Sequence, residues 1–496
     1  MSISTVVSTV YGKIEGKIEN GVSVWKGIPY ARPPIGNLRF KAPKTVESWN
    51  DIKKTIDFSP IAPQISLEKI VGLVNEDCLY LNIWSPNADN AKRPVLFWIH
   101  GGAYLTGSGS ISMYNGSALS KEGNIVVVTI NYRLGPFGFL CATNLPGGEL
   151  FDTNNGLRDQ LAALKWVKEN IRNFGGDSDN IMIFGESAGG ASVINQMGSP
   201  KAKGLFQKAI AQSPCMYAFY SDSNTAIKST VRLLETLGLK SSEILKLWNL
   251  PVKDLVDASV KIVDEIAEVK PGNIAFQPVL GDDVLPVAPY LAISKGIGST
   301  VPLIVGSNQD EGTMFATLPV ARIMPINDDL ISRFLEQNYP SQIAKIKDAY
   351  KSIPIQARSV KMGGDSSIMR SVNKIAESMT AVNTVYTYRF RWTSNYLIQK
   401  GLSSFHSLEI PFVFKNLQSI EARAMLKKTD ENEIENLSHT MSQAWINFAH
   451  TGNPNISGEI EWPAYDMDTR PCIVFDQKIS IENDIEAEFR NAWSNS

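Results

Sequence analysis

Short apolar runs separated by polar stretches dominate the pattern of this chain. Five runs have the length of strands: residues 95–99 with Pro94 before them, 124–132, 180–184, 301–306 and 472–475. Their apolar residues are continuous rather than alternating, which is typical of parallel strands covered on both faces. The pattern therefore predicts a central, largely parallel sheet.

A helix is predicted between the second and third runs, with the pair Gly175-Gly176 as its stop. Its apolar residues recur at steps of three and four and comprise Leu157, Leu161, Leu164, Val167, Ile171 and Phe174. Strand, helix and strand in this order imply a right-handed crossover between parallel strands. Residues 220–270 and 320–385 look mostly helical. We therefore expect an α/β fold with a large mixed, mostly parallel sheet flanked by helices, and helical insertions over the active site.

The composition is that of a globular protein, with 496 residues, 43% of them hydrophobic and 20% charged. Length alone would allow about three domains, but no repeat or long linker divides the chain, so we expect one domain over residues 1–496. The net charge of −2 leaves no basic surface for nucleic acid or an anionic membrane. No apolar run approaches the ~18 residues of a membrane span.

Cysteine usage and the N-terminus indicate a cytoplasmic protein. Cys78, Cys141, Cys215 and Cys472 are widely spaced and form no C-x-x-C pair, which argues against a zinc or redox site. The N-terminal residues lack a basic segment followed by a long apolar core, so we expect no secretory signal. Free thiols in a reducing compartment follow from both observations.

The stretch FGESAGGAS, residues 184–192, contains a G-x-S-x-G motif centred on Ser187. A nucleophile elbow requires a strand before such a serine and a helix after it. The apolar run 180–184 meets the first condition, and residues 188–197 meet the second. Gly185 and Gly189 then relieve crowding in a strained turn. This context favours a nucleophilic serine over an ordinary loop.

A serine nucleophile needs a base, and the chain has only four histidines. His100 lies before the serine and is interpreted as a backbone partner. His439 and His450 belong to a predicted amphipathic helix and look like ordinary surface or helix-end residues. His406 follows a strand-like segment, residues 386–392, in a loop, and we predict it as the base.

A carboxylate must orient the base, and α/β-hydrolases carry serine, acid and histidine in that chain order. Asp310 and Glu311 directly follow the apolar run 301–306. Either carboxylate fits the spacing, and a solvated turn is the alternative for the pair.

An oxyanion hole requires backbone N–H groups beside the serine. The sequence HGGAY follows the run 95–99, and Gly101 and Gly102 would let the backbone approach a substrate closely. Ala188, directly after the serine, would add an N–H group at the start of its helix.

Taken together, these residues resemble the type B carboxylesterase/cholinesterase family of α/β-hydrolases, and within it the bacterial p-nitrobenzyl esterases. The resemblance covers nearly the whole chain, and its markers are GIPYARPPIGNLRFKAP, EDCLYLNIW, WIHGGAY, NYRLGPFGFL, FGGDSDNIMIFGESAGG, DEG, FHSLEIPFVF and WINFAHTGNPN.

The resemblance implies a role for each site residue. It implies Ser187, Glu311 and His406 as a catalytic triad. The oxyanion donors would be Gly102, Ala103 and Ala188, with Gly101 in the same loop. Glu186 and Ser213 would steady the histidine and its acid from the second layer of the site. It also implies two structural ion pairs, Arg39 with Glu76 and Arg133 with Asp159.

The chain departs from the family pattern at three places. Ala62 stands where many relatives carry a cysteine that pairs with the equivalent of Cys78, so we expect Cys78 to be unpaired. The loop 63–77 has no aromatic residue, so the choline-binding platform of cholinesterases is absent. Pro214 replaces the usual glycine beside the expected acyl pocket.

We therefore predict a serine carboxylic-ester hydrolase that acts on small to medium acyl esters, including aryl esters, through an acyl-enzyme and without a metal or organic cofactor. The same machinery suits an amidase, thioesterase or carbamate hydrolase, and a non-catalytic cholinesterase-like binding protein is a further alternative. We expect a monomer or small homo-oligomer. Apolar pocket walls and core packing are alternative interpretations of four aromatic residues, Phe276, Phe315, Phe412 and Phe414.

Overall fold

The computed structural model describes residues 5–65, 72–215, 220–317 and 323–494. Within these ranges a large sheet contains β3 (Lys17–Glu19), β4 (Val22–Pro29), β6 (Tyr80–Ser85), β7 (Arg93–Ile99), β8 (Val126–Ile130), β9 (Gly176–Glu186), β10 (Lys208–Gln212), β11 (Leu303–Asn308), β12 (Val385–Phe390), β13 (Pro471–Phe475) and β14 (Ser480–Asn483). Their order across the sheet is β14-β13-β12-β11-β10-β9-β7-β8-β6-β4-β3. A small separate sheet joins β1 (Val6–Thr9), β2 (Gly12–Glu15) and β5 (Lys53–Lys54).

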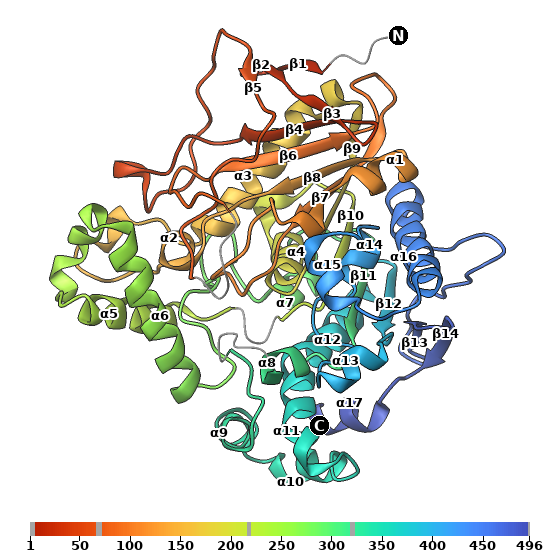
Figure 1. The fold of residues 1–496 in the computed structure, drawn as a ribbon. Helices are drawn as coiled ribbons and strands as arrows, with labels where there is room; N and C mark the ends of the chain where they lie inside the picture. The colour runs from red at the N-terminus through yellow and green to blue at the C-terminus, as the bar shows by residue number, and fades with distance from the viewer. Residues whose placement is uncertain (1–4, 66–71, 216–219, 318–322, 495–496) are drawn as a thin grey trace.

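The centre of the large sheet is parallel, from β13 through β12, β11, β10, β9 and β7 to β8. Antiparallel strands close it at both ends, with β14 beside β13, and β6, β4 and β3 beyond β8. All five predicted runs lie in the parallel part, as β7, β8, β9, β11 and β13. The predicted α/β fold with a mixed, mostly parallel sheet is therefore confirmed. Figure 1 shows this sheet passing through the molecule from β3 in red to β14 in blue.

Helices surround the sheet. They are α1 (Ser117–Gly123), α2 (Gly135–Phe139), α3 (Asn155–Asn170), α4 (Ala188–Gly198), α5 (Ser223–Thr236), α6 (Val252–Val269), α7 (Pro289–Ser294), α8 (Thr313–Thr317), α9 (Asp328–Asn338), α10 (Ile343–Ala349), α11 (Ile355–Gly364), α12 (Arg370–Met379), α13 (Asn395–Gln399), α14 (Ile410–Val413), α15 (Ile420–Met425), α16 (Glu431–Thr451) and α17 (Ala487–Trp493). The predicted helix over 157–174 is α3 followed by a 3-10 turn at Ile171–Phe174, and Gly175 ends it at φ 83°.

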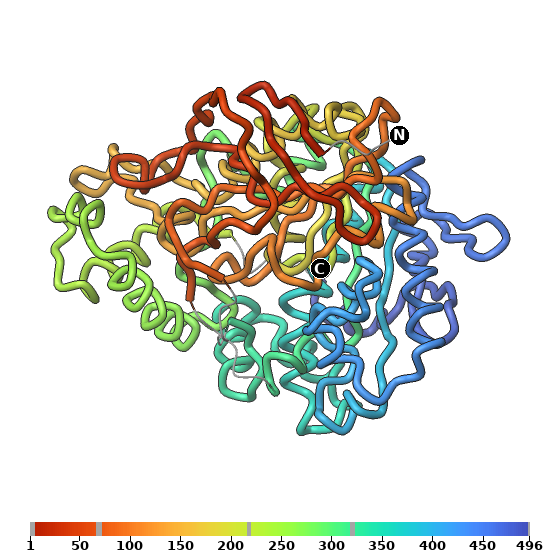
Figure 2. The backbone as a smooth tube through the Cα atoms, turned by 45° about the horizontal axis from the view of Figure 1, so that its top comes forward, coloured from red at the N-terminus to blue at the C-terminus, as the bar shows by residue number. Residues whose placement is uncertain are grey.

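The two faces of the sheet are buried under different helices, as the alternation of strand side chains requires. In β9, Ile181 and Ile183 face a core shared with α3 and α4, whereas Met182 and Phe184 face a core shared with α16. In Figure 2 the chain likewise runs from the N-terminal strands in red on one side to the C-terminal segments in blue on the other. None of the helices in the described ranges is long and apolar enough to cross a membrane.

Two buried arginines tie the N-terminal segment to the sheet, and both expected ion pairs are present. Arg133 is 2% exposed and binds Asp159 through Nε and Nη2 at 2.8 and 2.7 Å, while its Nη1 donates to the Lys41 carbonyl at 2.7 Å. Arg39 binds both carboxylate oxygens of Glu76 at 2.7 and 2.8 Å. The bidentate geometry compensates the cost of burying these charges.

All four cysteines are free thiols. Cys78 is fully buried and forms no disulfide, as expected from Ala62, which stands where many relatives carry the pairing cysteine. Much of the loop 63–77 lies outside the described residues.

We expect Asp159→Asn to destabilise the protein strongly, because the guanidinium of Arg133 would stay buried without a counter-charge. Losing one partner of a buried pair typically costs about 3–5 kcal/mol. The denaturant midpoint of unfolding measures this. Asp179→Asn is the matched control, since Asp179 pairs with Lys168 and Arg172 at the exposed surface and its loss should change the midpoint little. If the denaturant midpoint fell equally in Asp159→Asn and Asp179→Asn, the expectation would be wrong.

Candidate active site

The predicted site residues meet at one edge of the sheet, because parallel strands bring their carboxyl ends together. Gly101 and Gly102 follow β7, Ser187 follows β9, and Ser213 follows β10. Glu311 follows β11, and His406 lies in the long connection after β12. Chain segments more than 200 residues apart are therefore neighbours here.

Ser187 occupies a strained turn between β9 and α4. Its backbone has φ 59° and ψ −122°, a region that L-residues rarely adopt. Its N–H donates to the Gln212 carbonyl at 2.9 Å, which fixes the turn against β10. A Cβ at Gly189 would come within 2.0 Å of the Ile99 carbonyl oxygen, and one at Gly185 within 2.6 Å of the same atom. Only glycine fits on either side of the serine, as the sequence predicts.

The glycine loop after β7 lies directly against this serine. A Cβ at Gly101 would come within 3.1 Å of Ser187 Cβ. Gly102 and Ala103 both have positive φ, 101° and 58°. Within the described residues their N–H groups donate no hydrogen bond, and Ala188 is the first residue of α4, where helix N–H groups lack intrahelical partners. The loop and the helix start thus offer free donors beside Ser187.

His406 and Glu311 form a short, buried pair. The Nδ1 atom of His406 lies 2.6 Å from Oε2 of Glu311, and both side chains are less than 5% exposed. The other oxygen of Glu311 accepts from Ser213 Oγ and from the Asn308 N–H, each at 2.7 Å. Asp310 instead accepts from Ser403 Oγ at 2.8 Å. The geometry therefore separates the two carboxylates that the sequence left as alternatives.

The second ring nitrogen of His406 faces Glu186. Its Nε2 lies 3.0 Å from Glu186 Oε1, yet within the described residues it forms no hydrogen bond, to Ser187 or to any other group. Glu186 Oε1 accepts from Ser407 Oγ at 2.6 Å. Glu186 thus contacts the histidine directly, next to the ring that the resemblance expects it to steady.

Burial and the neighbouring carboxylates govern the protonation of this pair. Burial raises the pKa of Glu186 to about 8, and the charges of Glu409 and Glu311 act in the same direction, against the opposing charge of His406. Burial lowers the pKa of His406, but the charges of Glu186 and Glu311 outweigh it and raise the pKa to about 9. The two groups titrate together, because protonation of Glu186 removes a charge that raises the pKa of His406.

Two residues beside the site carry signals that the sequence analysis did not use. Glu409, three residues after His406, is buried and accepts from Gln212 Nε2 at 2.9 Å and Asn308 Nδ2 at 2.7 Å. Burial raises its pKa. The hydroxyl of Ser187 is in hydrogen-bond contact with the Cys215 thiol, whose pKa burial raises well above its usual value. The E in FHSLE could have pointed to Glu409, whereas no local pattern marks Cys215.

The other histidines lie elsewhere, as predicted. His100 is buried, its Nδ1 lies 2.8 Å from the Gly101 carbonyl oxygen, and burial lowers its pKa to about 4. His439 and His450 are exposed on α16. Phe315 lies 5.4 Å from the His406 ring, whereas Phe276, Phe412 and Phe414 are buried in the cores. Nowhere in the described ranges do three or more His, Cys, Asp or Glu side chains gather in a way that could hold a metal ion.

A serine held in a strained turn between a central parallel strand and a helix is the hallmark of the α/β-hydrolases. The comparisons with known proteins agree. The model of the carboxylesterase family matches residues 3–493. The para-nitrobenzyl esterase of Bacillus subtilis is 41% identical over 482 residues, covering 95% of each chain. The phenmedipham hydrolase of Pseudarthrobacter oxydans is 31% identical over 482 residues and 94% of each chain.

Solved structures are similar over the whole length. A thermophilic para-nitrobenzyl esterase has a TM-score of 0.87 at 39% identity, covering 98% of this chain and 99% of its own. A carboxylesterase of Geobacillus stearothermophilus has a TM-score of 0.86 at 36% identity, and the match covers 99% of this chain and 100% of that one. The chain therefore belongs to the carboxylesterase family, and it is a serine hydrolase of carboxylic esters.

We expect Glu186→Gln to lower the pKa of His406 by about one unit or more, because the variant removes a negative charge that stabilises the imidazolium. With four histidines in the chain, NMR of histidine-labelled protein can follow each imidazole through a pH titration. The low pKa of His100 serves as the internal control and should stay where it is. An unchanged His406 titration would show that Glu186 does not set its charge.

Proposed function

We propose that Ser187 is the nucleophile of this esterase, that His406 is its general base and that Glu311 orients the imidazole. The 2.6 Å contact between His406 Nδ1 and Glu311 Oε2 is the observation that carries the proposal. It leaves Nε2 as the only ring nitrogen free for proton transfer. The strained turn presents Ser187 at the same sheet edge, and such turns are typical of nucleophilic serines.

The reaction follows from these positions. His406 Nε2 takes the proton of the Ser187 hydroxyl while Oγ bonds to the ester carbonyl carbon, and the carbonyl electron pair moves onto its oxygen. The N–H groups of Gly102, Ala103 and Ala188 hold this oxyanion. When the tetrahedral intermediate collapses, the bond to the alkoxy oxygen breaks and His406 protonates the leaving alcohol. Water then attacks the acyl-enzyme by the same steps and releases the acid.

The base can work only when its Nε2 carries no proton. In the proposed working state Glu186 is the neutral acid, a form that burial favours by raising its pKa to about 8, so the charge that raises the pKa of His406 is absent. The neutral acid then leaves the imidazole uncharged at neutral pH. Nε2 turns from Glu186 toward Ser187 when substrate binds, since catalytic hydrogen bonds often tighten only in the complex.

The proposal also covers the substrates, the cellular compartment, the domain organisation and the oligomeric state. Small to medium acyl esters, aryl esters among them, are the proposed substrates, and the 41% identity to a para-nitrobenzyl esterase supports esters whose alcohol part carries an aromatic ring. Four free thiols support a cytoplasmic enzyme. We further propose that residues 1–496 form a single domain, with helical insertions at about 220–270 and 320–385 over the active site, and that the enzyme is a monomer or small homo-oligomer.

We expect Ser187→Ala to reduce kcat/KM for p-nitrophenyl esters at least about 10³-fold, because no acyl-enzyme can form. Circular dichroism should show an unchanged fold. Ser192→Ala is the matched control. Ser192 lies in the same helix, and its hydroxyl contacts Gln160 and Tyr104 rather than the site. Turnover by Ser187→Ala at the level of this control would refute the nucleophile.

We expect Glu311→Gln to lower kcat by about 10³- to 10⁴-fold, because an amide cannot stabilise the imidazolium and favours the wrong tautomer. The adjacent Asp310→Asn should keep most of the activity, since Asp310 contacts Ser403 and not the histidine. Steady-state kinetics on the two variants compares neighbouring carboxylates directly. If Asp310→Asn lowered kcat more than Glu311→Gln does, Asp310 would be the residue that orients His406.

A further inference from the structure

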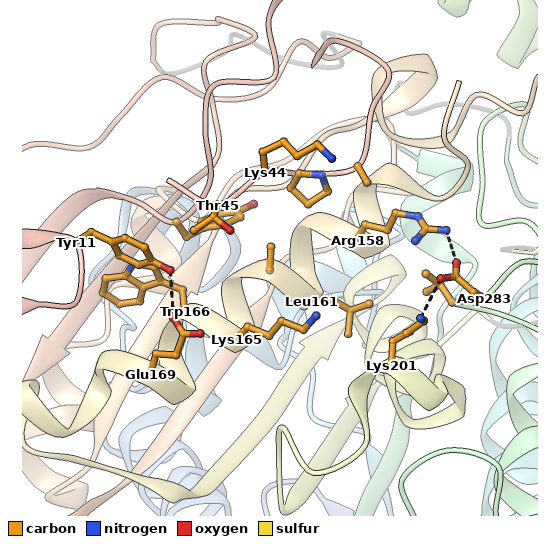
Figure 3. A pocket seen from close by; sticks show the side chains of 15 residues that line it. Tyr11, Lys44, Thr45, Arg158, Leu161, Lys165, Trp166, Glu169, Lys201 and Asp283 are labelled. Carbon is orange, nitrogen blue, oxygen red and sulfur yellow. Dashed lines mark hydrogen bonds and ion pairs between the residues drawn. The ribbon is translucent and has the colours of Figure 1, made fainter. Parts of the chain in front are cut away.

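A cavity of about 320 Å³ lies beside α3, and none of the residues that line it belongs to the candidate active site. Its walls come from distant parts of the chain: the turn between β1 and β2, the end of β4, residues 42–45, one face of α3, and residues 201 and 283–284. The volume falls at the lower end of the range for small-molecule sites. Figure 3 shows the side chains that line it.

One end of the cavity is aromatic and apolar. Trp166 and Tyr30 are buried, at 1% and 3% exposure, and Leu161 adds an aliphatic surface between them and the opposite end. Tyr11 lies beside Trp166 in Figure 3, and its hydroxyl donates to Glu169 Oε2 at 3.1 Å. Trp166 and Tyr30 are covered by their neighbours, so the half-buried ring of Tyr11 is the aromatic surface that a planar ring can cover at this end.

The opposite end is charged and held in place. Arg158 Nη2 binds Asp282 at 3.0 Å and Asp283 at 2.6 Å, and Lys201 binds Asp283 at 3.2 Å. Arg158 Nε also donates to the Thr153 carbonyl at 2.8 Å. These contacts satisfy the charges of Arg158 and Lys201 and close that end of the cavity.

Two further cations have no counter-charge. Lys44 and Lys165 are exposed residues at the rim of the cavity, and within the described residues their ammonium groups form neither an ion pair nor a hydrogen bond. In Figure 3 both side chains reach into the space between the Tyr11 end and the Asp283 end. Most other lining groups that carry charge are paired, so the cavity has an excess of positive charge in a chain whose net charge is −2. Such a lining repels metal cations and attracts an anion.

The wall that carries Lys44 is fixed by backbone hydrogen bonds. The Arg32 N–H donates to the Lys44 carbonyl at 2.9 Å, and the Ala42 N–H donates to Asp152 Oδ2 at 2.7 Å. Lys165 stands on the opposite wall, in the regular part of α3. The backbone positions of both lysines are therefore set before any ligand arrives, which reduces the cost of binding.

We propose that this cavity binds a small amphipathic anion, an aromatic ring that bears one carboxylate or phosphate group. The ring lies against Tyr11, and the oxyanion lies between the ammonium groups of Lys44 and Lys165. The site is separate from Ser187, so the inference stands or falls independently of the proposed function. An ester hydrolase releases carboxylates, and aryl carboxylates belong to the ligand class of this cavity.

Isothermal titration calorimetry of the full-length protein at low ionic strength tests the proposal. Benzoate and phenyl phosphate are the two anionic probes, and benzyl alcohol is the neutral probe with the same ring. We expect at least one anion to bind, benzyl alcohol to bind more weakly, and Kd for the anion to rise about tenfold or more in Lys44→Gln/Lys165→Gln. Which of the two anions binds more tightly identifies the oxyanion as carboxylate or phosphate.

Lys228→Gln is the matched control, because Lys228 is an exposed lysine of α5 outside the cavity, and it should bind the probes like the wild type. All variants should keep the wild-type kcat/KM for p-nitrophenyl acetate, which separates this site from the esterase site. Failure of both anions to bind the wild type would overturn the proposal. So would equal anion binding by the double variant, which would place the probe elsewhere, for example at Ser187.

Discussion

The close passage of α4 beneath β7 is the constraint on which the rest of the site depends. The chain turns from β9 into α4 at a single residue, Ser187, and Gly189 packs so tightly that an added Cβ would lie 2.0 Å from the Ile99 carbonyl oxygen. At this turn Ser187 has a positive φ of 59°. The backbone strain is compensated by the parallel strands on either side, which hold the turn in register.

Electrostatics around His406 follow from that geometry. The turn places Glu186 beside the imidazole, and β11 and the 404–409 loop add Glu311 and Glu409, so three buried carboxylates surround one ring. Three negative charges cannot all be maintained in so small a volume without water. A proton on Glu186 or His406 relieves this repulsion, and Glu311 is held in place by hydrogen bonds from Ser213 and Asn308.

Helix α3 connects two otherwise separate parts of the molecule. On one face, Gln160 donates to Ser192 and Gln196 of α4 donates to the Leu157 carbonyl, so α3 supports the helix that follows Ser187. On another face, Leu161, Lys165 and Trp166 line the positively charged cavity. The same rigid helix thus serves as a support for the esterase site and as a wall of the proposed anion site.

The sequence by itself determined the parallel sheet, the helix α3, the turn at Ser187 and the histidine in the loop after β12. These features depend on the local spacing of apolar residues and on glycines that avoid steric clashes. Both signals can be recognised within a short segment of sequence. The sequence missed β4, β6 and β10. Polar residues such as Asn82 interrupt the apolar run of β6, and β10 has only three apolar residues between Lys208 and Gln212. Those positions are tolerated because distant side chains satisfy them, as Thr129 does for Asn82.

Spacing alone left open which carboxylate meets His406, and the family resemblance implied Glu311. Only the tertiary structure decided where Glu186 lies relative to Nε2, and that Lys44 and Lys165 share one cavity. Asp310 and Glu311 are adjacent in the chain, and the path of the loop after β11 alone sends one toward the histidine and the other toward Ser403. Charge pairing between segments 100 or more residues apart depends on how strands are ordered in the sheet, and no local pattern encodes that order.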